Sequence, residues 1–121
     1  MKTLKLFSSI FTMFLALVLL VGCNISQSYA DKINKAAEKD EHIEYSEVIK
    51  KLGEENVIDI TAEVLGYRVG VVIGVKGLDD KEALEEKIEA GEKVEGIIVT
   101  IANGKAMSAK YGEINADDLK K

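Results

Sequence analysis

The chain has 121 residues, and its 21 acidic side chains outnumber 16 basic ones, which gives a formal net charge of −5. Binding to nucleic acid needs a basic surface, so this balance argues against a nucleic-acid partner. With one Cys and no Pro, the chain has no internal disulfide, and its length suffices for one domain held by its own hydrophobic core.

The N-terminal segment has the order of a secretory signal. Lys2 and Lys5 precede an almost wholly apolar run over residues 6–21, and Gly22 places a small residue before Cys23. A signal peptide has this order of basic, apolar and small residues. The apolar run is shorter than the about 20 residues of a permanent membrane span. We therefore expect a cleaved signal over 1–22, with an uncleaved signal anchor as the alternative.

Residues 20–23, Leu-Val-Gly-Cys, resemble the lipobox of bacterial lipoproteins. In that family a diacylglycerol is attached to the Cys sulfur and the chain is cut just before the Cys. The resemblance implies that Cys23 is lipidated and holds the protein on the extracytoplasmic side of the cell membrane, since two acyl chains anchor stably. Removal of 22 residues from 121 leaves 99, with 14 basic against 21 acidic side chains and a formal charge of −7.

The stretch that follows Cys23 is polar and then densely charged. Residues 24–30 read as a short tether. Over 31–41, Ile33 and two alanines have helical spacing but form only a narrow apolar stripe, so this stretch is either a helix or more tether. We expect a lipidated Cys with a polar, charged tether over 23–42, and one folded domain over 43–121.

The next elements are a helix and a strand pair. Residues 45–53 repeat apolar side chains at helical spacing, and Gly53 is suited to end the helix. Over 57–65 the period changes to two, which predicts a strand. Residues 66–68 interrupt the pattern before a second strand over 69–76. The predicted buried positions of the first strand are Ile58, Ile60, Ala62 and Val64. Gly70 and Gly74 share one face of the second strand, which suggests either that something packs close there or that the strand is weak.

A charged helix over 79–90, with Asp79 near its start and Gly91 after its end, precedes two more strands over 94–102 and 105–111. Asn103 and Gly104 between them predict a two-residue hairpin turn. That turn pairs Ile101 with Ala106 and Val99 with Ser108, and Thr100 with Met107 and Ile98 with Ala109. Ile97, Val99 and Ile101 are the predicted core side. The polar tail after residue 113 is expected to fray. The expected fold is α+β, a small antiparallel sheet of about four strands with two or three helices packed against it.

Catalysis needs titratable groups with matched pKa values in a cleft, and the sequence offers no such constellation. His42 is the only His, and no other ligand has zinc-site spacing around it, so a solvated surface side chain is expected. The acids of 79–89 lack the calcium-loop pattern and suit helix capping and a solvated face. We expect no enzyme, no cofactor and no metal. Tyr67 and Tyr111 are candidates for an interaction surface, because Tyr is enriched in binding hot spots.

The segments YSEVIKKLG (45–53) and VTIANGKAMSAKY (99–111) resemble the fold shared by β-lactamase-inhibitor-protein-like domains and the small outer-membrane-assembly lipoproteins. In that group a short helix ends in Leu-Gly, and a strand ends in an apolar residue before an Asn/Asp-Gly-Lys turn. The matching positions are Val48, Leu52, Gly53, Ile101, Gly104 and Lys105. The chain departs from the family at Glu54, where Pro is usual, in strands that lack a large aromatic, and in the inserted helix over 79–90. The resemblance implies a binding or assembly role, and it transfers no particular partner.

The sequence therefore predicts a membrane-anchored lipoprotein of the cell envelope that binds another envelope protein without catalysis. Two alternatives stay open. One is a small-ligand or metal-binding lipoprotein, which needs a concave pocket. The other is an inhibitor of an envelope enzyme, which needs an apolar surface bearing Tyr67 or Tyr111.

Overall fold

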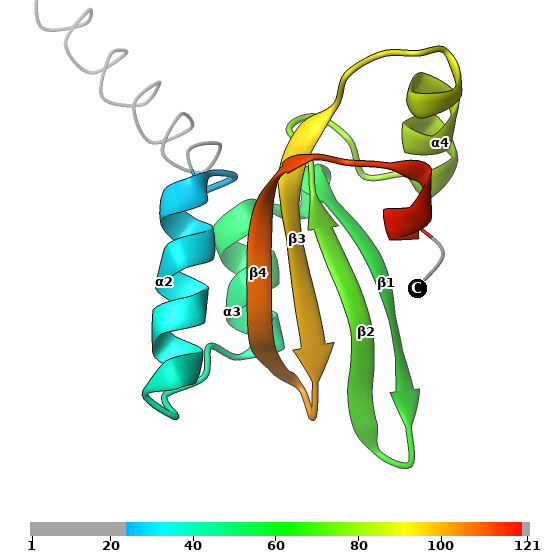
Figure 1. The fold of residues 1–121 in the computed structure, drawn as a ribbon. Coiled ribbons are helices and arrows are strands. Elements are labelled where there is room, and N and C mark those ends of the chain that lie inside the picture. Colours follow the sequence, from blue (N-terminus) through cyan, green and yellow to red (C-terminus); the bar gives the residue numbers. More distant parts are fainter. Residues whose placement is uncertain (1–23, 120–121) are drawn as a thin grey trace, which may run out of the picture.

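The computed structural model describes residues 24–119, so Cys23 and the predicted signal lie outside the described residues. The described chain forms one antiparallel sheet in the order β1-β2-β3-β4, with helices before the sheet and between its two hairpins (Figure 1). The helices are α2 (Gln27–Glu38), α3 (Tyr45–Leu52) and α4 (Lys81–Glu89), and the strands are β1 (Val57–Val64), β2 (Tyr67–Gly74), β3 (Glu95–Ala102) and β4 (Lys105–Glu113). Two short 3₁₀ turns are η1 (Glu54–Asn56) and η2 (Ala116–Leu119). The predicted α+β class with a small four-stranded antiparallel sheet is confirmed.

Each face of the sheet packs against its own helices (Figure 1). The first core lies under α2 and α3 and consists of Tyr29, Ala30, Ile33, Ile43, Val48, Leu52, Val57, Val72, Ile97, Val99, Ile101 and Ala106. The second core lies under α4 and η2 and consists of Ile58, Val71, Ile73, Val75, Leu84, Val94, Ile114 and Leu119. Apolar side chains that alternate along each strand therefore find a covering layer on both sides.

Residues 27–38 form helix α2, so the helix alternative is confirmed over 31–38, and the tether predicted over 23–42 is wrong for 27–38. Tyr29 and Ile33 lie one turn apart on the helix and are buried in the first core. The sequence pattern around Ile33 alone looked too narrow, because Tyr29 stood in the stretch assigned to the tether. The folded domain therefore includes α2 and begins well before residue 43.

Polar contacts fix α2 to the rest of the domain. The side-chain amide of Asn34 donates to the carbonyl of Ala109 and accepts from its N–H, both at 2.9 Å, so the helix is bonded to strand β4. The Ser26 hydroxyl accepts a hydrogen bond from the first turn of the helix. Just before it, the amide of Asn24 donates to the carbonyl of Lys51 at 2.8 Å. The chain is held to the domain from its first described residue.

Both hairpin turns consist of two residues with positive φ. Leu65 (54°) and Gly66 (84°) join β1 to β2, so the expected interruption over 66–68 is wrong and β2 begins directly after Gly66. Asn103 (56°) and Gly104 (72°) join β3 to β4, which confirms the predicted Asn-Gly turn.

The register of the β3–β4 pair departs from the prediction at one point. Ile101 pairs with Ala106 as predicted, but a bulge between Thr100 and Ile101 shifts the remaining pairs by one residue. A bulge sets two residues of one strand against one of its partner, and the extra residue here is Met107. The predicted pairs beyond the bulge are therefore wrong. The predicted core side of β3 is confirmed by the burial of Ile97, Val99 and Ile101.

The segment after β4 docks on the sheet, so the prediction that it frays is wrong for 114–119. Ile114 and Leu119 are 2% and 3% exposed and lie in the second core with Leu84 of α4. Ile114 and Leu119 are five residues apart with polar or small residues between them, so the sequence shows no apolar repeat that predicts their burial.

Local end signals of the helices are mostly as predicted. Gly53 follows α3 with a positive φ of 88°, and Gly91 follows the end of α4 with a positive φ of 83°. Both glycines therefore have a positive φ, which residues with a side chain rarely adopt. The N-cap of α4 is Asp80 and not Asp79, since the Asp80 carboxylate accepts from a backbone N–H of the first turn.

The two glycines of β2 lie where other parts of the chain approach closely. A Cβ on Gly74 would lie 3.1 Å from the Leu52 side chain of α3. A Cβ on Gly70 would collide with the backbone of Ile60 in β1. The predicted close packing is therefore confirmed at Gly74. At Gly70 the collision is with the backbone of the paired strand and goes with its φ of 143°.

Candidate functional site

The free end of the β1–β2 hairpin carries exposed apolar side chains. Leu65 is 94% exposed, Tyr67 58%, Val64 55% and Val69 45%. We call these four residues the hairpin patch. Val64 pairs with Tyr67, Val69 lies on the same face of β2 as Tyr67, and Leu65 is the turn residue beside Val64. The largest apolar patch of a monomer is often its interaction site.

The hairpin patch continues the stripe of side chains that forms the second core. Paired residues of β1 and β2 point to the same face, and the pair Ile58–Ile73 is buried in the second core. At the other end of the same series lies the pair Val64–Tyr67. In Figure 1, α4 and η2 cover only the end of the sheet away from the hairpin turn. Val64 was predicted to be buried by its alternation with polar residues, and it is exposed because no helix reaches it.

Leu65 adds a conformational cost to its exposure. It occupies the first turn position at φ 54°, where the other hairpin has Asn103 at 56°. A bulky L-residue in this left-handed region costs about 1–2 kcal/mol, whereas Asn and Gly tolerate it. Because Leu65 is also almost fully exposed, its side chain gains no burial within the domain. A residue that is strained without benefit to the fold points to a functional use.

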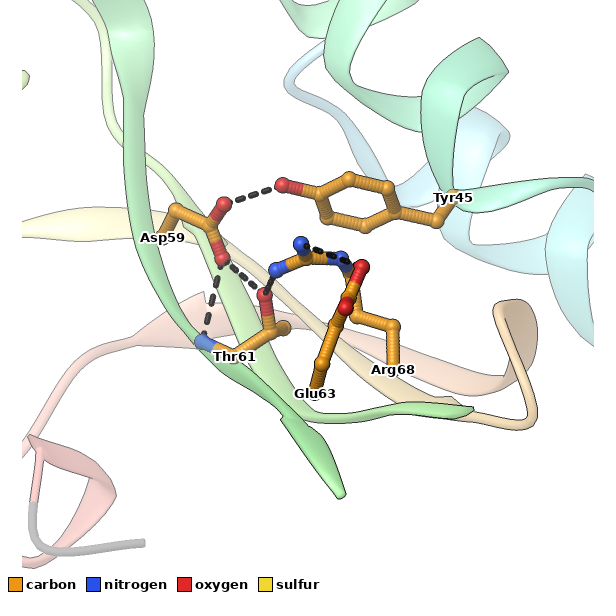
Figure 2. A network of polar contacts seen from close by, with 5 residues as sticks. All are labelled: Tyr45, Asp59, Thr61, Glu63 and Arg68. Atoms are coloured by element: carbon orange, nitrogen blue, oxygen red, sulfur yellow. Dashed lines mark hydrogen bonds and ion pairs between the residues drawn. The ribbon is translucent and has the colours of Figure 1, made fainter. Parts of the chain in front are cut away.

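A network of polar contacts braces the opposite face of the same hairpin (Figure 2). The Tyr45 hydroxyl, at the start of α3, donates to the carboxylate of Asp59 in β1. That carboxylate also accepts the backbone N–H of Thr61 at 3.0 Å. Burial raises the pKa of Tyr45, and the hydrogen bond to Asp59 raises it further. The network thereby ties α3 to the edge strand of the sheet.

Arg68 of β2 completes the network. Its guanidinium donates to the Thr61 hydroxyl at 2.8 Å and lies 3.5 Å from the Glu63 carboxylate. It also stacks 4.8 Å from the centre of the Tyr45 ring, which is a favourable cation–π distance. The five side chains of Figure 2 therefore have their partners within the network. Such an arrangement suits a brace that fixes the direction of the hairpin.

The two tyrosines proposed from the sequence lie apart. Tyr67 belongs to the hairpin patch. Tyr111 pairs with Ile97, packs half-buried against the first core, and directs its hydroxyl toward Glu95 at 3.5 Å. Only Tyr67 of the pair therefore lies in an exposed apolar surface.

The other members of the hairpin patch, Val64, Leu65 and Val69, were not proposed from the sequence as interaction residues. The signal available for Leu65 was an apolar residue directly before the glycine of a two-residue turn. Nothing comparable marked the two valines, which lie on strands like their buried neighbours.

The candidate metal ligands do not converge. His42 is 15% exposed, so the expected solvated side chain is wrong, and its Nδ1 lies 3.6 Å from Asp40. Over residues 24–119 no group of three or more His, Cys, Asp or Glu residues has the arrangement of a metal site. Around α4, Asp80 caps the helix and Glu85 pairs with Lys81 at 3.9 Å. In the same residue range no helix is long and apolar enough to cross a membrane.

The described surface also has open hollows. One of about 610 Å³ lies between the loops that flank α4, among Lys76, Lys87, Lys93 and Glu92. Ligand pockets usually bury most of their ligand and are predominantly apolar. This hollow is open and lined by charged side chains, so it differs from such pockets.

Comparison with known proteins gives no relative: no family model, curated protein or solved structure matches the chain. Four of the positions that carried the family resemblance have a structural role. Val48, Leu52 and Ile101 lie in the first core, and Gly104 has the positive φ of the second hairpin turn.

Proposed function

We propose that the protein is a lipoprotein of the cell envelope, anchored through Cys23, whose folded domain is a non-catalytic protein-binding module. The anchor is supported by the basic, apolar and small residues that precede Cys23. The binding role is carried by one observation, the strained and exposed Leu65 at the centre of the hairpin patch. The brace of Figure 2 supports it, because a rigid hairpin presents its side chains at low entropic cost.

The anchor is tested by replacing the thiol. Cys23→Ala in cells should leave the precursor uncut or release the protein from the membrane fraction, because no acyl chain is then attached. Asn24→Ala, a change next to the cleavage point that keeps the thiol, is the matched control and should stay membrane-bound. If the Cys23→Ala chain is cut before residue 23 and stays in the membrane fraction, the lipoprotein assignment is wrong.

A second candidate function is inhibition of an envelope enzyme. It is favoured by the projecting turn at Leu65, since an exposed apolar residue on a braced loop suits insertion into an enzyme cleft. Activity profiling of envelope hydrolases with and without the purified protein distinguishes inhibition from simple docking. Loss of one activity that Leu65→Asn restores supports inhibition, and unchanged activities exclude it for the enzymes profiled.

A further inference from the structure

The hairpin patch lies at the end of the sheet opposite the N-terminal end of the described chain (Figure 1). A strand rises about 3.3 Å per residue, so a strand of the length of β1 spans roughly 25 Å. The turn is therefore about one strand length from the end where α2 begins. Asn24 is bonded to Lys51, and Ile25 packs against the first core, so the chain is fixed to the domain directly after Cys23. With a lipid on Cys23, as in the function proposed above, the patch faces away from the bilayer, and the anchoring membrane does not cover it.

A second copy of the chain is also a poor occupant. After removal of residues 1–22 the chain has 14 basic and 21 acidic side chains, and the formal net charge of −7 makes two copies repel each other. β1 is an edge strand, and an antiparallel pair of two β1 strands centred on Thr61 sets Asp59 of one copy opposite Glu63 of the other. Like charges in that position destabilise a sheet. Packing face to face adds only the four side chains of the patch, whereas a standard interface buries about 800 Å² per partner.

The surroundings of the patch define a complementary partner. Along the outer edge of β1, apolar Ala62 and Val64 point to one side, and acidic Asp59 and Glu63 point to the other. The Glu63 side chain is 68% exposed. Arg68, whose guanidinium lies 3.5 Å from the Glu63 carboxylate, is the cationic side chain of the network. A segment lying along the edge therefore meets apolar side chains on one side and, on the other, the two carboxylates of Asp59 and Glu63 against the single guanidinium of Arg68. Complementary charge on the partner raises the association rate and its specificity.

We propose that the hairpin patch and the outer edge of β1 form the docking site for an apolar segment of another protein that carries Lys or Arg beside its apolar residues. This inference rests on the binding role proposed above and names the chemistry of the partner. Leu65 is the anchor residue, since it is exposed, apolar and held at the tip of a braced hairpin.

The test uses the full-length chain in lipid nanodiscs and a random peptide library displayed on phage. Selected peptides should be enriched in apolar residues and in Lys and Arg relative to Asp and Glu. Leu65→Asn should weaken their binding by about fivefold or more. Met107→Ser is the matched control, because Met107 is 43% exposed on β4 outside the patch. This variant should bind within about twofold of the original chain.

Several outcomes overturn the proposal. These are peptides enriched in acids, peptides that bind Leu65→Asn equally well, and failure to select any peptide. If the original chain sediments as a dimer and the Leu65→Asn variant as a monomer, the occupant of the patch is a second copy of the chain. Leu65-dependent binding of the Cys23→Ala chain to phosphatidylglycerol vesicles names a lipid surface. The peptides are also measured on the chain from residue 24, which has no signal and no Cys23. Binding to this chain separates failure of the anchor from failure of the docking site.

Discussion

Leu65→Asn should make the domain more stable, which is unusual for the removal of an apolar side chain. Leu65 has φ 54° and is 94% exposed, so the substitution relieves backbone strain and loses almost no burial. Asn occupies the equivalent position of the other hairpin at φ 56°. With a cost of about 1–2 kcal/mol for a bulky residue in this region, we expect the free energy of unfolding to rise by about 1 kcal/mol. For a domain of this size that corresponds to about 4–8 °C in Tm.

Urea unfolding followed by circular dichroism measures this effect on the chain from residue 24, which spans both cores. Asn103→Leu is the mirror control and should lower the free energy of unfolding by a similar amount, about 1 kcal/mol. A decrease in stability for Leu65→Asn would show that Leu65 makes a contact that the fold needs. The inference of a binding role from strain would then lose its basis.

Three further changes test other parts of the structure. Ile33 is fully buried, so Ile33→Ala should lower the free energy of unfolding in the same urea assay by about 2–5 kcal/mol. A change below about 0.5 kcal/mol, typical of a surface substitution, would mean that α2 is a tether after all. Burial raises the pKa of Tyr29 to about 12, with Glu47 adding to it. The unfolded chain therefore loses this proton first, and stability should fall by about 2–3 kcal/mol between about pH 10 and about pH 12. Tyr29→Phe should reduce that loss in urea titrations across this range, and an identical pH profile for both chains would contradict the burial argument. Tyr45→Phe removes the hydrogen bond to Asp59. It should cost about 1 kcal/mol in the urea assay, with no loss if the brace is not formed in solution.

Local signals in the sequence predicted the fold class and most of its elements. Gly53 follows a helix, and Asn103-Gly104 forms a hairpin turn, because few other residues accept a positive φ at such positions. These positions can therefore be predicted from the sequence. The burial of Tyr29 and Leu119 could not be predicted from the sequence, because it depends on contacts with strands that are distant along the chain. The bulge between Thr100 and Ile101 was not predicted either, because the Asn-Gly turn determines only the pairs next to it.

The candidate site was predictable only in part. Tyr67 was identified from its residue type, and the structure sets it in an exposed apolar surface. Val64 and Val69 alternate with polar or small neighbours as buried strand residues do, and their exposure follows from where α4 ends. Leu65 was missed because a bulky apolar residue is disfavoured at a turn position with positive φ. That departure from local preference is what marks it in the structure.

The most direct test of the anchored binding module is the mass of its N-terminal peptide. The protein is purified from the membrane fraction, digested and measured by mass spectrometry. The peptide should begin at Cys23 and carry the added mass of a diacylglyceryl group on the sulfur. A peptide that begins at residue 1, or one that begins at Cys23 with an unmodified thiol, would contradict the lipid anchor on which the outward orientation of the hairpin patch depends.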